Sequence, residues 1–573
     1  MTPKAGESPE RASLTNAGVP ATSSLLLWLA ATLLLLVVYY PALRGTFVSD
    51  DLGYLVSNGW IHRLNLTDLR EILDPWGGPA NFTLNFAPVN LLLLALQWSL
   101  FGANPLGYHV TNIAIHALVS VLLLLLFRRT GIGPRAAFFG ATLFLLHPAN
   151  VEAVAWASQQ KTLIALALAL GALLLHPRRP ALGALCFGLA ILTKALAGFA
   201  LPVAAFWAWA GRDEEGASPP RGGWLALWAA AFCLYAVPEF AAFRQGNEVG
   251  ATLGHDVATH LRTMVALGAR YVVMALTSFG VGPFHQPPLV TSFRDPWFWG
   301  GLVAGLLLGG RTFVTLRRGR VEGGFWIWAA IGYAPISQIV PFIFPLADRY
   351  LYFILPGWIG AGLLAWQEAM GRSLLAPRLR GWRLMHSPIR DRVALGFALL
   401  ASTGLALRSN AQAWLWRSEA ALAIAAARGS PDGISAHLWA AREAAARGDG
   451  AAVAKELRAA ADHGWNDVVS LPDQVAFAPV RQDPQFQAVL VELAGRLIDD
   501  SKGIPPSSQP ALLVLARAHE LRGERAEQRA LLEQAIAVGG PMTEGARKLL
   551  VEAERNEAAA KAREERGGSK TPN

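Results

Sequence analysis

The sequence has few charged residues: Asp, Glu, Lys and Arg make up 16% of its 573 positions, against about 25% in a typical soluble domain. Hydrophobic residues account for 53%, and the mean hydropathy is +0.34. Long uncharged runs include Ala12–Leu43, Gly107–Phe127, Gly323–Ala347 and Val393–Leu407. Because a helix of roughly 18 or more apolar residues can cross a bilayer, the sequence predicts an all-α, polytopic membrane protein.

Cysteine is also scarce. Cys186 and Cys233 each lie in an apolar run without metal-like spacing, so both are expected to be core residues. The sequence contains no Walker loop, GxSxG, HExxH or zinc-site spacing, and no soluble nucleotide-binding domain. A transferase built mainly from membrane helices would therefore need an activated donor that dissolves in the membrane. A polyprenyl-phosphate sugar meets this need.

The net charge is +9, and the basic residues lie in short loops beside apolar runs. This placement indicates that the basic residues orient the protein in the membrane and do not bind nucleic acid. These loops are Arg128–Arg135, Arg178–Arg179, the region of Arg212–Arg221, Arg317–Arg320 and Arg372–Arg392. With all of them in the cytoplasm, eleven spans are predicted: 22–41, 107–127, 135–148, 157–175, 180–194, 195–211, 223–241, 297–316, 324–344, 350–368 and 392–408. In this scheme Asn85–Phe101 and Arg262–Phe284 are amphipathic or re-entrant helices on the outer face.

This topology predicts an integral protein of the bacterial inner (plasma) membrane, with its C-terminal domain outside, in the periplasm. The predicted parts are a cytoplasmic tail at 1–20, a membrane domain at 21–409 with a large outer loop at 41–106, a helical domain at 410–554 and a disordered tail at 555–573. Two stretches of the helical domain share the same spacing of Gly, Leu and Ala. They are Gly448, Leu457 and Ala460, and Gly523, Leu532 and Ala535, which predict degenerate tetratricopeptide-like helical hairpins.

Two adjacent carboxylates, Asp50 and Asp51, directly follow the first span among apolar neighbours. A carboxylate in this place could accept a proton from an attacking hydroxyl or hold a divalent cation through oxygen. A helix cap or an interfacial charge pair is an equally good interpretation.

Polar residues also mark the outer ends of two other spans. His147 and Glu152 surround Pro148, where they could contact substrate or simply cap a helix that the proline stops. His109 lies near the outer end of the second span and could reach a site. His116 lies deeper in the same span and is expected to make an interhelical hydrogen bond.

Lys161 and Lys194 are cations in largely apolar sequence, and such costly residues are functional candidates. A lipid phosphate at the outer surface would be a natural partner. Asp348, Arg349 and Tyr352 begin the tenth predicted span. Arg349 could bind a phosphate through its planar guanidinium, although Asp348 and Arg349 could also be an interfacial anchor within an aromatic belt.

Taken together and in order, these residues resemble the membrane glycosyltransferases of the GT-C fold. The closer match is to the transmembrane and tetratricopeptide-repeat O-mannosyltransferases and their bacterial relatives. The resemblance rests on Phe47–Asp51, Asn58, Ala87–Asn90, Phe101–His116, His147–Trp156, Thr193–Lys194 and Asp348–Tyr352.

The resemblance implies inverting transfer of a sugar, mannose in this family, from a dolichyl- or undecaprenyl-phosphate donor to a hydroxyl acceptor on a protein or glycan. It implies that Asp50 or Asp51 is the catalytic base, that Arg349 and Lys194 contact the lipid phosphate, and that His147 and Glu152 line the site. It does not require a metal or other cofactor. Asp348 departs from the family pattern, in which Glu is commoner before Arg-Tyr.

Two other functions remain compatible with the residues. A transporter or flippase for a lipid-linked substrate would be expected to show internal symmetry, which the sequence lacks. A membrane-anchored scaffold would use the repeat tail to recruit partner proteins, but this function leaves the polar residues of the outer segments unexplained.

Overall fold

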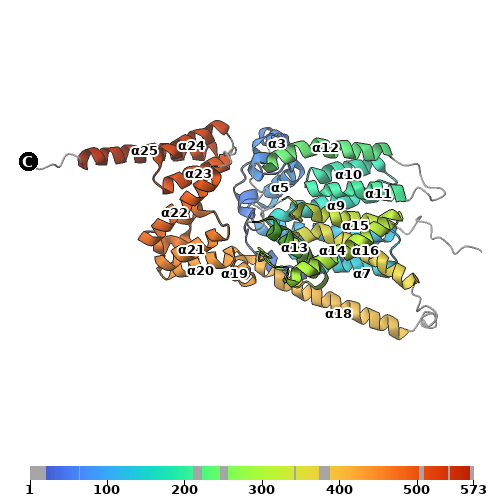
Figure 1. Ribbon diagram of the computed structural model, residues 1–573. Helices are drawn as coiled ribbons and strands as arrows, with labels where there is room; N and C mark the ends of the chain where they lie inside the picture. Colours follow the sequence, from blue (N-terminus) through green and yellow to red (C-terminus); the bar gives the residue numbers. More distant parts are fainter. Residues whose placement is uncertain are drawn as a thin grey trace, which may run out of the picture.

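The computed structural model describes residues 21–63, 65–210, 222–244, 256–340, 344–372, 388–502, 509–539 and 542–567. Across these residues the chain is helical without any strand, which confirms the predicted all-α class (Figure 1). A bundle of elongated helices forms one half, and short helices packed in hairpins form the other. The predicted N-terminal tail and the basic loops near 212–221 and 373–387 lie outside the described residues.

The elements of the first half run in the following order. They are α1 (Ala21–Val38), α2 (Tyr40–Leu43), η1 (Leu52–Val56), α3 (Leu66–Leu73), α4 (Gly78–Thr83), α5 (Pro88–Phe101), α6 (Pro105–Arg129), α7 (Pro134–Leu146), η2 (Pro148–Asn150), α8 (Val151–Ala155), η3 (Ala157–Gln159), α9 (Gln160–Leu175), α10 (Pro180–Ile191), η4 (Ala195–Phe199), α11 (Ala200–Ala210), α12 (Gly222–Arg244), α13 (Val257–Thr277), α14 (Pro296–Arg317), α15 (Val321–Tyr333), η5 (Ala334–Ile336), α16 (Asp348–Arg372) and α18 (Pro388–Ala413).

Each predicted span coincides with an apolar helix of this bundle, but the number of spans stays a prediction. Four described helices are long and apolar enough to cross a membrane alone: α6, α9 with η3, α12 and α14. A fifth span results if α7 and α8, which meet at a bend of 51°, count as one. Pro148 accounts for the bend because proline cannot continue the preceding helix. Four apolar helices of the described part are shorter than a span: α1, α5, α10 and α11 with η4.

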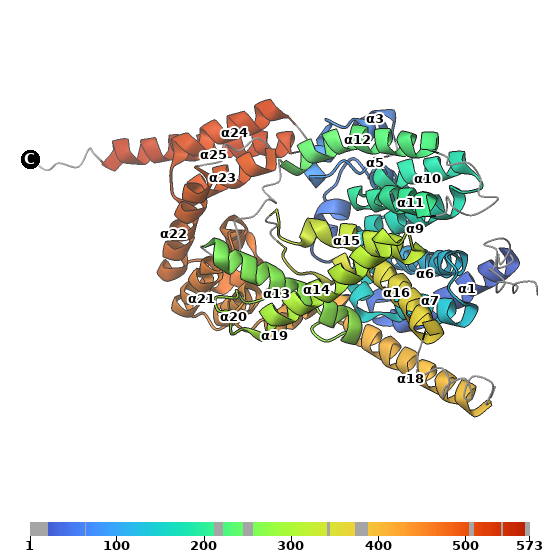
Figure 2. The same cartoon turned by 45° about the vertical axis from the view of Figure 1, so that its right-hand side comes forward.

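The two segments predicted not to cross the bilayer form helices α5 and α13. With 14 residues, α5 is about 21 Å long, shorter than the roughly 30 Å hydrocarbon layer. It lies with α3 at the end of the bundle that faces the other half of the molecule (Figure 1). Helix α13 carries Arg262 and Arg270 and packs against α14 (Figure 2). Neither α5 nor α13 is among the helices with the length and composition of a span.

The described basic loops meet at the opposite end of the bundle. The Gln367 side chain bonds to the backbone at Gly131, and its neighbour Glu368 pairs with Arg320. Twenty residues of α16 separate Glu368 from Asp348, which corresponds to about 30 Å of helix and matches the thickness of the hydrocarbon layer. The first outer loop and Asp348 therefore lie at one end of the helices, and the arginine-rich loops lie at the other.

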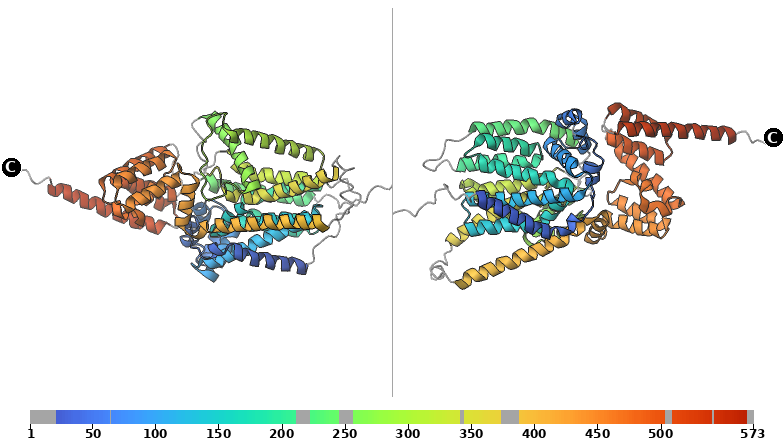
Figure 3. Two further views of the ribbon diagram at one scale, coloured as in Figure 1. Left: turned by 90° about the horizontal axis from the view of Figure 1, so that it is seen from below. Right: turned by 180° about the vertical axis from the view of Figure 1, so that it is seen from behind.

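The second half contains η6 (Leu415–Arg417), α19 (Glu419–Gly429), α20 (Ile434–Ala446), α21 (Gly450–Asp462), η7 (Val468–Asp473), η8 (Val475–Val480), α22 (Pro484–Ser501), α23 (Gln509–Leu521), α24 (Arg525–Val538) and α25 (Thr543–Gly567). It lies beyond the outer end of the bundle (Figure 3). Helix α18 continues to Ala413, so η6 begins just after the predicted boundary. Helix α25 includes part of the segment 555–573 that the sequence predicts as disordered.

The predicted sequence repeat corresponds to two equivalent hairpins, α20–α21 and α23–α24. Gly448 and Gly523 form the two turns, and both have φ near +75°, a conformation that glycine adopts without steric cost. The matching apolar positions are buried in both hairpins: Leu457, Ala460, Leu532 and Ala535. The shared spacing of glycine, leucine and alanine therefore reflects a repeated helix–turn–helix unit.

Candidate functional site

Asp51 is buried and binds the backbone on both sides of it. One carboxylate oxygen accepts the Val48 N–H at 3.1 Å, and the other accepts the Ser158 N–H at 2.7 Å. Burial raises the pKa of Asp51 to about 7, against the lowering effect of these hydrogen bonds. Because both oxygens are engaged, Asp51 joins the first outer loop to the segment before α9.

Asp50 presents its carboxylate in a different way. Its side chain is exposed and makes no hydrogen bond or ion pair to any residue that the structure describes. Its charge interacts with the Lys161 ammonium and with the Arg349 guanidinium, which belong to α9 and α16. The loop thus places one free carboxylate near cations from two different helices.

Lys161 and Lys194 form a pair of neighbouring cations. The Lys161 ammonium donates to the Tyr54 hydroxyl at 3.0 Å and lies 4.5 Å from the centre of that ring. The Lys194 ammonium donates to the Thr162 hydroxyl at 2.8 Å. Within the described ranges neither lysine pairs with a carboxylate, and their charges repel each other. Two partly buried ammonium groups with neutral partners are suited to bind an anion.

Arg349 is held by a carboxylate and surrounded by aromatic rings. Its guanidinium donates to Glu152 Oε1 at 2.5 Å, and its backbone N–H donates to Glu152 Oε2 at 2.9 Å. The guanidinium also lies 4.9–5.5 Å from the ring centres of Trp156, Phe344 and Tyr350. Glu152 and Arg349, both predicted to lie at the site, therefore form a direct, largely buried ion pair. This pair holds the arginine in place.

Asp348 faces the loop between α13 and α14. His285 Nε2 lies 2.7 Å from one oxygen of Asp348, and the Gly282 N–H donates to the other at 2.9 Å. Burial lowers the pKa of His285, but the charge of Asp348 and this hydrogen bond outweigh it, so the pKa is raised above its usual value. Asp348 thus ties the loop between α13 and α14 to the start of α16.

Glu239, near the end of α12, is a component that sequence reasoning missed. Its carboxylate accepts the Phe86 N–H at 2.7 Å, and its charge interacts with Lys161 and Lys194. It is the only carboxylate of an otherwise apolar helix. That signal could have identified it, because an acidic residue in such a segment is costly. His285 was also missed, because its loop carries no comparable pattern.

Three predicted contact residues make other interactions. Both ring nitrogens of His147 are engaged, with the Ala275 carbonyl at 3.0 Å and the Ala149 N–H at 3.2 Å. The Tyr352 hydroxyl lies 2.9 Å from His116 Nδ1, inside the bundle. His109 is buried beside the backbone of Ala155 without a well-aligned hydrogen bond among the described residues.

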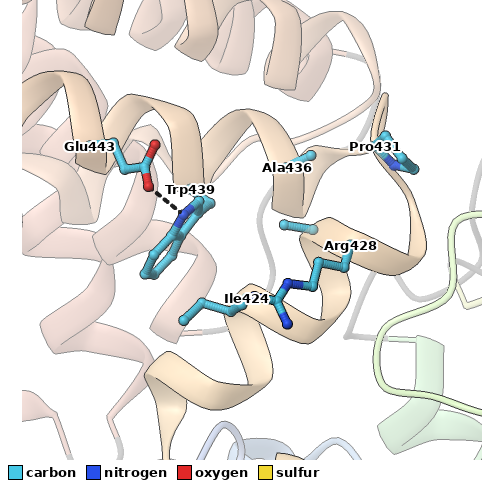
Figure 4. A pocket seen from close by; sticks show the side chains of 7 residues that line it. Ile424, Arg428, Pro431, Ala436, Trp439 and Glu443 are labelled. Carbon is cyan, nitrogen blue, oxygen red and sulfur yellow. Dashed lines mark hydrogen bonds between the residues drawn. The ribbon is translucent and has the colours of Figure 1, made fainter.

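A pocket lies on the second half of the molecule, between α19 and α20 (Figure 4). Its lining combines apolar groups with Trp439 and two charged residues, and the Trp439 indole donates to Glu443 at 3.0 Å. The remaining lining residues are Ile424, Ala427, Arg428, Pro431 and Ala436. The turn beyond the pocket approaches Gln286 of the membrane half at Gly433. The pocket therefore lies close to the outer end of the bundle.

One end of the bundle of apolar helices carries the side chains of Asp50, Glu152, Lys161, Lys194 and Arg349. No three His, Cys, Asp or Glu side chains among the described residues group closely enough to bind a metal ion. The fold and site together define a helical membrane protein with a charged site at the end of the bundle that faces the second half of the molecule.

Comparison with known proteins finds no matching family model. The chain is 35% identical over 167 residues to the protein O-mannosyl-transferase TMTC1 of Mus musculus, covering 28% of this chain and 17% of that protein. It is 30% identical over 138 residues to TMTC4 of Homo sapiens, covering 21% and 18%. It is 30% identical over 153 residues to the protein O-mannosyl-transferase F38B6.6 of Caenorhabditis elegans, covering 25% and 21%.

These identities confirm the resemblance to the transmembrane and tetratricopeptide-repeat O-mannosyltransferases. The matched region is about a fifth of the length of these relatives or less. Among solved structures, the chain is similar to ArnT from Cupriavidus metallidurans bound to undecaprenyl phosphate, with 17% identity and a TM-score of 0.35. That comparison covers 91% of this chain and 82% of ArnT.

Proposed function

We propose that the chain transfers a sugar, mannose, from a polyprenyl-phosphate donor to a hydroxyl group of a protein acceptor at the outer face of the membrane. The observation that carries the proposal is the exposed Asp50 carboxylate on a loop whose Tyr54 hydroxyl accepts a hydrogen bond from Lys161 at 3.0 Å. A base beside an anion site is the minimum that such a transfer needs. The similarity to protein O-mannosyl-transferases supports the choice of sugar and acceptor.

The two lysines bind the donor phosphate in this proposal. Lys161 and Lys194 have only neutral hydrogen-bond partners, Tyr54 and Thr162, so they can exchange these for phosphate oxygens without breaking an ion pair. Their mutual repulsion favours an anion between them. As the bond between sugar and phosphate breaks, the charge that develops on the leaving phosphate is stabilised by the same ammonium groups.

Asp50 acts as the general base. The acceptor hydroxyl oxygen attacks the anomeric carbon, its proton passes to Asp50, and the polyprenyl phosphate leaves with the electron pair of the broken bond. Attack from the face opposite the phosphate inverts the anomeric configuration. Asp51 is less suited to this role, because its two oxygens already accept the Val48 and Ser158 N–H groups.

Arg349 has a supporting role. Its ion pair with Glu152 and its aromatic neighbours hold the guanidinium in one orientation, so its N–H groups do not have to be ordered during the reaction. The two lysines supply the charge that a divalent cation would otherwise provide. EDTA is therefore expected to leave the transfer rate unchanged.

The second half of the molecule would present the acceptor. Its pocket combines Trp439 with the charged Arg428 and Glu443. The adjoining turn touches Gln286, in the loop between α13 and α14. A polypeptide bound there would lie beside the membrane surface, which places the proposed reaction on the side opposite the arginine-rich loops. By the positive-inside rule that side is the exterior of a bacterial inner membrane.

Transfer of radiolabelled mannose tests the proposal. Purified protein in lipid nanodiscs is incubated with polyprenyl-phosphate mannose and unfolded acceptor proteins, with and without EDTA. We expect label in the acceptor protein and an inverted linkage. Movement of the lipid across the bilayer without any transfer would identify a flippase instead, and acceptor binding without transfer or lipid movement would identify a scaffold.

A further inference from the structure

The residue before Asp50 has an unusual backbone conformation. Ser49 has φ near +51°, in the left-handed region that side chains other than glycine rarely adopt. Such a conformation persists only where the surrounding structure enforces it. Ser49 lies within a tight turn that is closed by the Asp51 N–H, which donates to the Val48 carbonyl. After this turn, the Tyr54 N–H donates to the Asp50 carbonyl. The direction of the Asp50 side chain therefore depends on what holds Ser49.

Ser49 is held by the second half of the molecule. Its N–H donates to Glu419 Oε2 at 2.9 Å, and Glu419 is the first residue of α19. Nearby, the Thr46 N–H donates to the Arg417 carbonyl at 3.0 Å. A Cβ atom on Gly45 would lie only 3.1 Å from that carbonyl oxygen, so this glycine permits the close approach of the two backbones.

A buried tryptophan reinforces the same junction. Trp416 lies with its ring centre 5.2 Å from that of Trp156. The Trp156 indole donates to the Val48 carbonyl at 3.2 Å, and its ring also lies against the Arg349 guanidinium. The start of the second half thus contacts the loop that carries Asp50 and the ring that supports Arg349. Helix α19 lies at this junction in Figure 1.

We infer that Glu419 is a positioning residue for the proposed transfer. Its carboxylate holds Ser49 in the left-handed conformation, and that conformation directs Asp50 toward Lys161 and Arg349. The helix N-terminus at α19 favours a carboxylate at this place. Transfer therefore requires the second half to be docked on the membrane half, which couples the acceptor-presenting helices to the base. This inference rests on the proposed function.

A merely structural role for Glu419 makes a different prediction. If Glu419 only attaches the second half, a change at Ser49 cannot compensate for its loss. If Glu419 acts through the Ser49 backbone, Ser49→Gly restores activity to the Glu419→Ala variant, because glycine adopts a positive φ without steric cost. Glu419→Gln keeps an oxygen that can accept the Ser49 N–H and serves as the conservative variant.

Steady-state kinetics of the full chain in nanodiscs separate these cases. We expect Glu419→Ala to lower kcat about tenfold without changing KM for the lipid donor, since one hydrogen bond to a charged group is lost. Glu419→Gln and the double variant Ser49→Gly/Glu419→Ala should recover most of the rate. Glu544→Ala, at an exposed site near the start of α25, is the matched control. An unaltered kcat in Glu419→Ala, or no recovery in the double variant, would overturn the inference.

Amide hydrogen exchange provides a readout that does not depend on activity. Exchange at residues 46–52 should accelerate in Glu419→Ala and return toward the wild-type rate in the double variant, while Glu544→Ala leaves it unchanged. If wild-type protein transfers no sugar, the proposed function fails, and exchange at this loop still decides whether Glu419 holds it. Unchanged exchange in Glu419→Ala would contradict the inference in either case.

Discussion

The two ends of the helical bundle both carry charged residues, but these residues are paired in different ways. At the end with the arginine-rich loops, Arg311 donates to Glu322 at 2.8 Å and 2.6 Å and to Glu368 at 2.6 Å. Glu368 also pairs with Arg320, and the Trp326 indole donates to Glu322. Each carboxylate in this group is bound by an arginine. The group connects α14, α15 and α16 as a closed network, in which every carboxylate is matched by an arginine.

At the outer end the pairing is incomplete. Glu152 neutralises Arg349, but the structure places no carboxylate in contact with Lys161 or Lys194 within the ranges that it describes. The Asp50 carboxylate makes no hydrogen bond or ion pair to any residue in the described part of the chain. Because an isolated buried charge is costly, unpaired cations point to a ligand that completes them, whereas closed networks point to stability. The comparison therefore favours a structural role for one end and supports the proposed chemistry at the other.

The largest expected effect is on Asp50. Asp50→Asn removes the base and should lower kcat by about 10²- to 10⁴-fold, with normal expression and folding. The measurement is mannose transfer by purified variants of matched concentration. Asp51→Asn should mainly destabilise the loop, because its oxygens bind two backbone N–H groups. Near-normal transfer by Asp50→Asn would show that Asp50 is not the general base.

A smaller effect is expected at the donor phosphate. Lys161→Gln removes one of the two cations and should raise KM for the polyprenyl-phosphate donor by about tenfold, since a hydrogen bond from a charged donor is lost. Initial rates at varied donor concentration measure this change. Arg320→Gln, at the opposite end of the bundle, is the control and should leave KM unchanged. An unchanged KM in Lys161→Gln would exclude a phosphate at this lysine.

Changes in the closed network should lower the stability of the protein and leave the transfer rate unchanged. Glu368→Gln leaves Arg311 and Arg320 without one of their carboxylates and should lower the free energy of unfolding by about 2 kcal/mol. Thermal unfolding in detergent measures this loss, and transfer per folded molecule should remain at the wild-type level. A loss of transfer without a loss of stability would mean that this end also takes part in the chemistry.

The smallest effect concerns pH. The pKa of His285 is raised in the folded protein, so its pairing with Asp348 contributes stability below its unfolded pKa of about 6.5 and loses it as pH rises through the folded value. The difference in melting temperature between wild type and His285→Asn should therefore shrink as pH rises through the folded pKa of His285. A constant difference would show that the pair is not titrating.

Much of this arrangement could be predicted from the sequence. Lys161, Lys194, Glu152 and Arg349 are conspicuous because charges are costly in apolar segments, and the basic loops fixed which ends of the helices should meet. The glycine, leucine and alanine spacing likewise predicted the two hairpins of the second half, in which these positions are equivalent.

Other features depend on contacts between distant residues. Asp50 and Asp51 are neighbours with the same chemistry. The buried Asp51 carboxylate differs by the N–H groups that bind it, from the nearby Val48 and from Ser158, which is more than a hundred residues away. The role of His285 is recognised only from its contact with Asp348. His147, expected at the site, directs its ring nitrogens to backbone groups instead. Sequence patterns identify costly residues, but they do not specify their partners.

Binding of the lipid alone tests the central claim most directly. Undecaprenyl phosphate and undecaprenol, which lacks the phosphate, are compared for binding to wild-type protein, to Lys161→Gln/Lys194→Gln and to Arg311→Gln in nanodiscs by native mass spectrometry. The account predicts saturable binding of the phosphate lipid only, its loss in the double lysine variant, and its retention in Arg311→Gln. Equal binding of the two lipids, or undiminished binding by the double lysine variant, would contradict it.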